Sequence, residues 1–174
     1  IDDRKGLLRR GDRVLDAGAA PGSWSQVAAA RVGPRGEVVA VDLKPINPNG
    51  YASNVRLIQA DLRDLTTEDL GGRPFDAVIS DMAPDTTGVP MADAAVSVRL
   101  CHSLLDLAKE VLKVRGDLVM KVFGLLLVRE YGSVNEPNFI SISGFEKLPH
   151  VNKSPFLLTK ISVVLVVVLF VSNS

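Results

Sequence analysis

The chain has 174 residues, 47% of them hydrophobic, which is enough for one core but too short for two comfortable domains. Its 20 basic and 20 acidic residues cancel, so a basic field over the whole molecule is excluded, and a nucleic-acid partner would need a local patch. The single cysteine, Cys101, excludes an intrachain disulfide and favours a reducing compartment. With only His102 and His150 to join it, it makes no convincing zinc site, and no metal is expected.

The first segment, IDDRKGLLRRGD, lacks the apolar core of a signal peptide. It also lacks an initiator methionine, so we interpret the chain as a fragment or a processed product. Basic residues crowd this segment and could contact nucleic-acid phosphates, although a solvated face explains them equally well. They are Arg4, Lys5, Arg9, Arg10 and Arg13.

Five short apolar runs rich in Val, Ile and Leu predict strands that are buried on both faces, because they barely alternate with polar residues. Four of the five end on an aspartate, and the fifth contains Lys121. The runs are Arg13–Asp16, Glu37–Asp42, Val55–Asp61, Phe75–Asp81 and Asp117–Phe123.

Helix patterns lie between these runs. After the first run, Trp24, Val27, Ala28 and Val32 fall on one helical face. A short helix is expected at Thr66–Leu70, with a threonine cap and acidic residues in its first turn. The longest pattern, from about Ala94 to Lys113, has an apolar stripe of Leu100, Leu104, Leu107 and Val111, widened by Cys101, Leu105, Ala108 and Leu112.

The alternation of strands and helices predicts an α/β fold with a mostly parallel sheet and right-handed crossovers. The alternation ends near Gly124, and we expect loop or weak strand through Gly132–Pro155. Ile161–Val171 is an uncharged run of eleven residues, too short to span a bilayer. It predicts a buried or edge strand, with a membrane-associated tail as the alternative. We expect a single domain over 1–174.

The stretch Gly18–Gly22 follows the first strand, where open parallel sheets bind ligands. Gly18 and Gly22 tolerate positive φ, Pro21 stiffens the turn, and the following helix directs backbone amides at a ligand. A tight strand–helix turn with no ligand is the alternative interpretation.

Two aspartates at strand ends favour a cofactor that contains a nucleoside. Asp42 could accept hydrogen bonds from both hydroxyls of a ribose, and Asp61 could contact the exocyclic amine of a base. Each could instead be a turn residue. A dinucleotide requires G-x-G-x-x-G, which GAAPGSW lacks, whereas the sulfonium of S-adenosylmethionine is compatible with nearby acids.

With DAGAAPGSWSQ, VAVDLKP, QADLRD, SDMAPDTTG and MKVF in this order, residues 1–123 resemble the FtsJ/RrmJ family of ribose 2′-O-methyltransferases. SDMAP is similar to the large-subunit ribosomal RNA enzymes of bacteria and mitochondria, and APDTTG is similar to relatives that modify tRNA. The resemblance implies a Rossmann-like fold that binds S-adenosylmethionine. It also implies a cytoplasmic or mitochondrial-matrix location.

The resemblance implies a role for each matching residue. Pro21, Gly22, Ser23 and Trp24 would line the methionine and sulfonium part of the cofactor. Asp42 would hold its ribose, and Asp61 with the backbone of Leu62 would hold its adenine. Asp81 would lie beside both the cofactor and the target hydroxyl, and Lys121 would be the catalytic lysine.

The sequence departs from the family's Lys–Asp–Lys–Glu group at two positions. The first lysine would fall upstream of Ile1, and Lys5 comes too late in the motif to replace it. No Ser-Arg-Glu-Val-Tyr-like segment supplies the glutamate, and Glu146 is the nearest candidate by position. Residues 124–174 therefore form a divergent tail.

Methyl transfer to a ribose hydroxyl requires in-line positioning and removal of the hydroxyl proton. Lys121 could take the proton if its pKa fell from about 10.4 towards neutrality. Alternatively, it could stay charged and stabilise negative charge on oxygen, with Asp81 orienting it. A lysine at the sheet edge that reaches solvent is the non-catalytic alternative.

The sequence therefore predicts methylation of a ribose 2′-hydroxyl, of a uridine, in large-subunit ribosomal RNA. A tRNA substrate is the first alternative. A catalytically impaired RNA-binding assembly factor is the second, and a nicotinamide-dependent oxidoreductase is a weaker third.

Overall fold

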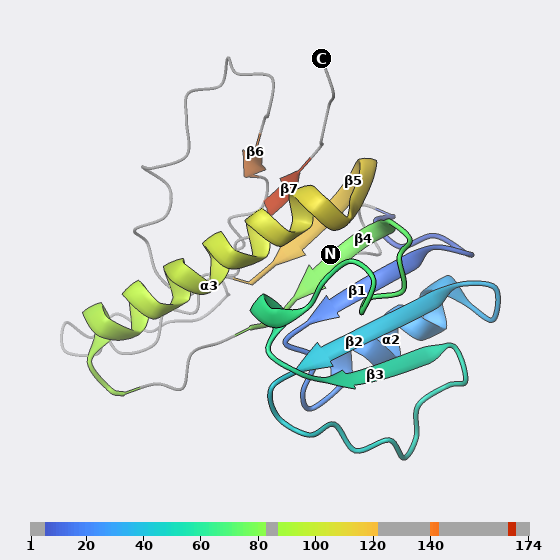
Figure 1. The fold of residues 1–174 in the computed structure, drawn as a ribbon, viewed down its shortest axis with the longest axis horizontal. Coiled ribbons are helices and arrows are strands. Elements are labelled where there is room, and N and C mark those ends of the chain that lie inside the picture. The colour runs from blue at the N-terminus through green and yellow to red at the C-terminus, as the bar shows by residue number, and fades with distance from the viewer. Residues whose placement is uncertain (1–5, 83–86, 122–139, 143–166, 170–174) are drawn as a thin grey trace, which may run out of the picture.

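The computed structural model describes residues 6–82, 87–121, 140–142 and 167–169. In this part of the chain, five parallel strands form one sheet in the order β3-β2-β1-β4-β5 (Figure 1). The strands are β1 (Arg13–Ala17), β2 (Glu37–Asp42), β3 (Val55–Gln59), β4 (Phe75–Ser80) and β5 (Leu112–Met120). The prediction of an α/β fold with a parallel sheet is confirmed.

Strands β1 to β4 begin where the sequence predicts and end within two residues of the predicted positions. The three central strands are almost fully buried because helices or loops cover both of their faces. β3 is half-exposed because it lies at the edge of the sheet (Figure 1). Its last predicted residues, Ala60 and Asp61, lie beyond the strand in the loop that follows it.

Two helices cover opposite faces of the sheet, α2 (Ser23–Val32) on one side and α3 (Pro90–Val111) on the other (Figure 1). The buried face of α2 consists of Ser25, Ala28, Ala29 and Val32. The prediction for Val27 is wrong, since this residue is 55% exposed. Small residues on the buried face let α2 lie close to the sheet, so this face does not need the larger apolar side chains that the pattern predicts.

The helix α3 buries most of the predicted stripe against the other face of the sheet. Its buried apolar residues are Cys101, Leu104, Leu105, Ala108 and Val111, and Leu107 packs partly against them. The helix ends at Val111, two residues before the predicted end, and β5 begins at once. No α-helix forms at Thr66–Leu70, where hydrogen bonds between Thr66 and Asp69 close a turn. A short 3-10 helix, η1 (Leu62–Asp64), precedes that turn.

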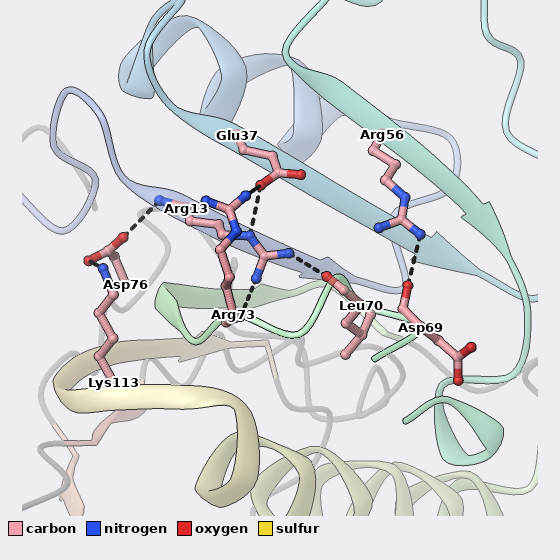
Figure 2. Close-up of polar contacts among 8 residues, drawn as sticks. All are labelled: Arg13, Glu37, Arg56, Asp69, Leu70, Arg73, Asp76 and Lys113. Carbon is pink, nitrogen blue, oxygen red and sulfur yellow. Dashed lines mark hydrogen bonds and ion pairs between the residues drawn. The ribbon is translucent and has the colours of Figure 1, made fainter. Parts of the chain in front are cut away.

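A buried arginine ties the amino ends of the strands together (Figure 2). The Arg13 side chain is 7% exposed, and its Nε donates to Glu37 at 2.7 Å. Its two terminal nitrogens donate to the backbone carbonyls of Leu70 and Arg73. The guanidinium also lies 4.0 Å from the centroid of the Phe75 ring. The interpretation of Arg13 as part of a nucleic-acid patch is therefore wrong, because its charge is buried and paired.

Further polar contacts extend this network to the neighbouring strands. Asp76 accepts hydrogen bonds from the Arg13 backbone at 2.8 Å and from Lys113 Nζ at 2.6 Å (Figure 2). Arg73 joins Glu37 at 2.8 Å, and Arg56 donates to the carbonyl of Asp69 at 2.8 Å. The amino edge of the sheet is thus held by charged groups that already have partners.

Two short strands lie in the tail, β6 (Ile140–Ile142) and β7 (Val167–Leu169), which pair antiparallel. β7 contacts β5 at the edge of the main sheet (Figure 1). It confirms a strand within the run at 161–171, although most of that run lies outside the described residues. The boundary expected near residue 123 stays a prediction. Within the described ranges, no helix has both the length and the apolar character needed to cross a membrane.

Candidate active site at the carboxyl edge of the sheet

A cavity of about 410 Å³ opens at the carboxyl edge of the sheet. The strand order reverses between β1 and β4, and ligands of open parallel sheets bind at such a switch point. The loops after four strands and the side of α3 supply the wall of the cavity. Its lining residues are Gly18, Ala20, Val41, Asp42, Leu43, Lys44, Ala60, Asp61, Leu62, Arg63, Asp81, Met82, Leu100 and Ser103.

The structure brings four of the predicted site residues to this cavity: Asp42, Asp61, Leu62 and Asp81. They come from three different strand ends, which explains why residues far apart in sequence converge. Residues 21–24, which span the end of the glycine loop (Gly18–Gly22) and the start of α2, do not line the cavity. Ser23 and Trp24 begin α2, and Trp24 packs against the apolar core beneath that helix.

The glycine loop passes very close to the end of β4. Gly18 has φ 77°, and a Cβ atom at this position would lie 2.3 Å from Met82 Cγ and 3.0 Å from Met82 Cα. Gly22 has φ 114°, and a Cβ atom there would overlap the hydroxyl of Tyr51. Both glycines adopt the positive φ that this residue type tolerates. Each position requires a positive φ and the absence of a Cβ atom. Only glycine satisfies both requirements, because other residues are strained at positive φ and carry a Cβ.

Asp42 links the glycine loop to the end of β2. One carboxylate oxygen accepts the backbone N–H of Ala20 at 2.8 Å, and the other accepts the backbone N–H of Lys44 at 2.7 Å. These two bonds fix the carboxylate at the wall of the cavity. Each oxygen retains acceptor capacity, which two neighbouring hydroxyl groups of a ligand could use.

Asp81 and Lys121 form an ion pair where β4 and β5 end. The Lys121 Nζ lies 2.8 Å from Asp81 Oδ1, and the two side chains are 25% and 33% exposed. The backbone N–H of Lys121 donates to the Ser80 carbonyl at 2.9 Å, which continues the pairing of the strands. The parallel register therefore places an amino group and a carboxylate together beside the cavity.

Sequence reasoning gave no role to Asp16, which is fully buried inside β1. Its Oδ2 accepts the Ser25 hydroxyl at 2.5 Å, and its Oδ1 has no hydrogen-bond partner among the described residues. Burial raises the pKa of this carboxyl to about 7, and the nearby charges of Asp81 and Asp42 act in the same direction. The sequence feature that could have identified Asp16 as a site residue is a single aspartate in an apolar strand, next to the glycine loop.

Met82, Leu100 and Ser103 also line the cavity and were missed by the sequence reasoning. The helical periodicity predicts Leu100 in the core, because periodicity alone does not show where a helix extends past a sheet. Among the described residues, no group of three His, Cys, Asp or Glu side chains could hold a metal ion. Lys5 and Glu146, discussed for the two absent family positions, lie outside the described residues.

Comparison with known proteins identifies relatives of the whole cavity-bearing region. The profile of the FtsJ-like methyltransferase family matches residues 1–154. A protein from Bdellovibrio bacteriovorus named ribosomal RNA large subunit methyltransferase E is 47% identical over 128 residues, which cover 71% of this chain and 64% of the relative. A protein of the same name from Desulfatibacillum aliphaticivorans is 48% identical over 119 residues, 67% of this chain and 57% of the relative. The chain thus spans roughly three fifths of these relatives' length.

Solved structures support the fold. A chain from Clostridium thermocellum, provisionally described as an rRNA-methylase, superposes with a TM-score of 0.64 at 16% identity and covers 99% of this chain and 94% of that one. A Plasmodium falciparum chain provisionally described as a ribosomal RNA methyltransferase gives a TM-score of 0.62 at 22% identity, with coverage of 76% and 74%. The fold, the glycine loop and the sequence matches agree, and the chain belongs to the FtsJ-like methyltransferase family.

Proposed function

We propose that this chain binds S-adenosylmethionine at the carboxyl edge of the sheet and methylates a ribose 2′-hydroxyl, on a uridine, of large-subunit ribosomal RNA. The observation that carries the proposal is the pair of Asp81 and Lys121, 2.8 Å apart, beside a cavity that Asp81 itself lines. The names of the relatives support the RNA class. The site of action would be the cytoplasm or the mitochondrial matrix.

The lining of the cavity fits this cofactor. The carboxylates of Asp42, Asp61 and Asp81 offer acceptors to the hydroxyl and amine groups of such a ligand, while Arg63 and Lys121 balance the charge of two of them. Leu62 and Met82 offer apolar surface to a flat ring. When bound, S-adenosylmethionine supplies a methyl group already activated by positive sulfur. Asp42 would hold the ribose, and Asp61 with the Leu62 backbone would hold the adenine. Residues 21–24 lie outside the cavity wall, and they would contact the methionine end only if it extends beyond that wall.

Lys121 would act on the target hydroxyl. Its Nζ, held in place by Asp81, either accepts the proton of the hydroxyl or stabilises the negative charge that develops on oxygen. Asp81 fixes the position of the amino group in both cases. The chain's contribution is therefore to orient the reacting oxygen and to accept its proton or stabilise its charge.

The decisive test separates binding from transfer. We expect Lys121→Ala to retain cofactor affinity in calorimetry and to lose methyl transfer by about 100-fold or more, the usual effect of removing an acid–base group. The assay measures transfer of a tritiated methyl group to naked ribosomal RNA, ribosomal subunits and tRNA. Lys109→Ala is the matched control, because this lysine is exposed on α3, where its Nζ pairs with Asp106 at 2.9 Å, and it is not part of the cavity wall.

Each outcome selects one interpretation. Transfer to ribosomal RNA or subunits that Lys121→Ala abolishes supports the proposal, and transfer only to tRNA favours the first alternative. Cofactor binding without transfer to any RNA favours the impaired assembly factor. Transfer that persists in Lys121→Ala contradicts the role of the lysine.

A further inference from the structure

An exposed arginine holds the carboxylate that we assign to adenine. The Nε of Arg63 lies 2.9 Å from Asp61 Oδ1 and 3.2 Å from Oδ2, and its Nη2 lies 2.5 Å from Oδ2. The backbone N–H of Arg63 also donates to Oδ1, at 3.0 Å. The guanidinium thus forms a bidentate pair with both carboxylate oxygens, and Arg63 lines the cavity together with Asp61.

The pair with Arg63 fixes the orientation of the Asp61 carboxylate. Its hydrogen bonds lower the pKa of Asp61 to about 2, which further favours the ionised form that an aspartate already takes at neutral pH. A bidentate pair also removes the rotational freedom of an exposed carboxylate. An ionised acceptor with a defined direction is what a ligand N–H needs.

The remaining acceptor capacity of Asp61 is limited. An ionised carboxylate offers roughly four lone-pair sites. Three N–H groups use it here, namely the backbone N–H, Nε and Nη2 of Arg63. About one acceptor site is therefore left for a ligand, and Arg63 determines which one.

We propose that Arg63 is a positioning residue that orients the last acceptor site of Asp61 towards the exocyclic amine of the cofactor's adenine, and thereby makes the cavity select an amino purine over an oxo purine. The inference rests on the proposed function, since it presumes that an adenosyl cofactor occupies the cavity. A purine with an oxygen in place of the amine would set a carbonyl against the carboxylate. It would also turn its ring N–H towards the Leu62 backbone N–H, so both contacts would become repulsive.

Calorimetry with two probes tests this selection. S-adenosylhomocysteine carries the amine, and S-inosylhomocysteine carries the carbonyl. We expect the unmodified protein to prefer the adenosyl probe by about tenfold or more, the scale of one charge-assisted hydrogen bond. Arg63→Ala should lose about tenfold in affinity for the adenosyl probe, and its preference should fall to about threefold or less. Arg63→Lys cannot form the bidentate pair, so its affinity for the adenosyl probe and its preference should lie between those of the unmodified protein and Arg63→Ala.

A double-mutant comparison shows whether Arg63 acts through Asp61. If it does, Asp61→Ala and the double variant Asp61→Ala/Arg63→Ala should bind the adenosyl probe equally weakly. Arg56→Ala is the matched control, since this exposed arginine lies on β3 and contacts the Asp69 carbonyl, outside the cavity wall. Thermal unfolding of each variant checks that the fold is retained.

The inference and the proposed function fail in different ways. Unchanged affinity and preference in Arg63→Ala overturn the inference alone. Tighter binding in that variant also overturns it, because Arg63 would then compete with the ligand. If the unmodified protein binds neither probe, the proposed function fails and the inference fails with it.

Discussion

At the scale of single residues, Asp16 is the most unusual group of the site. A carboxyl that is fully buried in a central strand would lose much solvation energy if it were charged. Its pKa therefore rises from 3.8 to about 7 on folding, although the hydrogen bond from Ser25 opposes the rise. The folded protein binds more protons than the unfolded chain between these two values.

This difference makes stability depend on pH. The contribution of Asp16 is fully present below about pH 4 and is lost as the pH rises through about 7, so the free energy of unfolding should fall over that window. We expect Asp16→Asn to reduce the fall by an amount on the order of a few kcal/mol. Urea unfolding at pH 5 and pH 8 measures it. Asp12 and Asp117 also have raised pKa values and form the background common to both proteins.

Ser25→Ala serves as the control for this assignment. Removing the hydroxyl deletes the contact that lowers the pKa of Asp16, so the fall in stability should persist and extend to higher pH. An Asp16→Asn variant whose stability depends on pH as strongly as that of the unmodified protein would contradict the assignment.

Residues at strand ends could be predicted from the sequence, and residues defined by distant partners could not. Asp42, Asp61 and Asp81 follow apolar runs, and parallel strands bring their carboxyl ends to one edge. Arg13 shows the opposite case. Its burial depends on an acceptor at Glu37 and on carbonyls near residue 70, which no local pattern connects to it.

At the scale of elements, the contact between the glycine loop and the end of β4 defines the site. Gly18→Ala would introduce a Cβ atom 2.3 Å from Met82 Cγ at a positive φ. We expect a loss of about 2–4 kcal/mol in the free energy of unfolding, since strain and overpacking add. The variant should also lose cofactor affinity, because the loop or Met82 must move. Chemical denaturation and calorimetry measure the two effects.

Gly50→Ala separates the two contributions. Gly50 also has a positive φ, 90°, but nothing lies within 4 Å of a Cβ atom there. It should cost only the strain of the left-handed conformation, about 1–2 kcal/mol. Equal losses at the two positions would show that close approach to Met82 does not matter.

The boundary between α3 and β5 shows why element ends were harder to predict. The sequence predicts a helix to about Lys113 and a strand from Asp117, yet Lys113–Gly116 lie inside β5, where Arg115 takes a positive φ of 65°. The register shifts between the pairs Phe75–Leu112 and Ala77–Asp117. Regular pairing with β4 therefore starts again at Asp117, where the sequence predicts that the strand begins. The earlier part of β5 is assigned through the single pair Phe75–Leu112, which no local sequence pattern indicates.

At the scale of the whole molecule, the carboxyl ends and the amino ends of the strands carry different groups. The carboxyl edge carries the cavity with its three carboxylates and the Asp81–Lys121 pair. The amino edge carries the network around Arg13 (Figure 2). A strand of five residues separates the two edges by about 17 Å. Arg9 and Arg10 precede β1 and are exposed at this second edge. They therefore lie at the opposite end of the strands from Lys121, where we propose that the target nucleotide reacts.

An RNA that extends beyond its reacting nucleotide can still reach Arg9. If Arg9 binds a phosphate, Arg9→Glu should weaken RNA binding and reduce the slope of log affinity against log salt by about 1, without changing the rate at saturating RNA. Lys109→Glu changes the net charge equally on the exposed side of α3, and it should leave the slope unchanged. Filter binding at several salt concentrations measures both variants. Equal slopes for Arg9→Glu and the unmodified protein would assign Arg9 to a solvated face, because a lost phosphate contact must release fewer counterions.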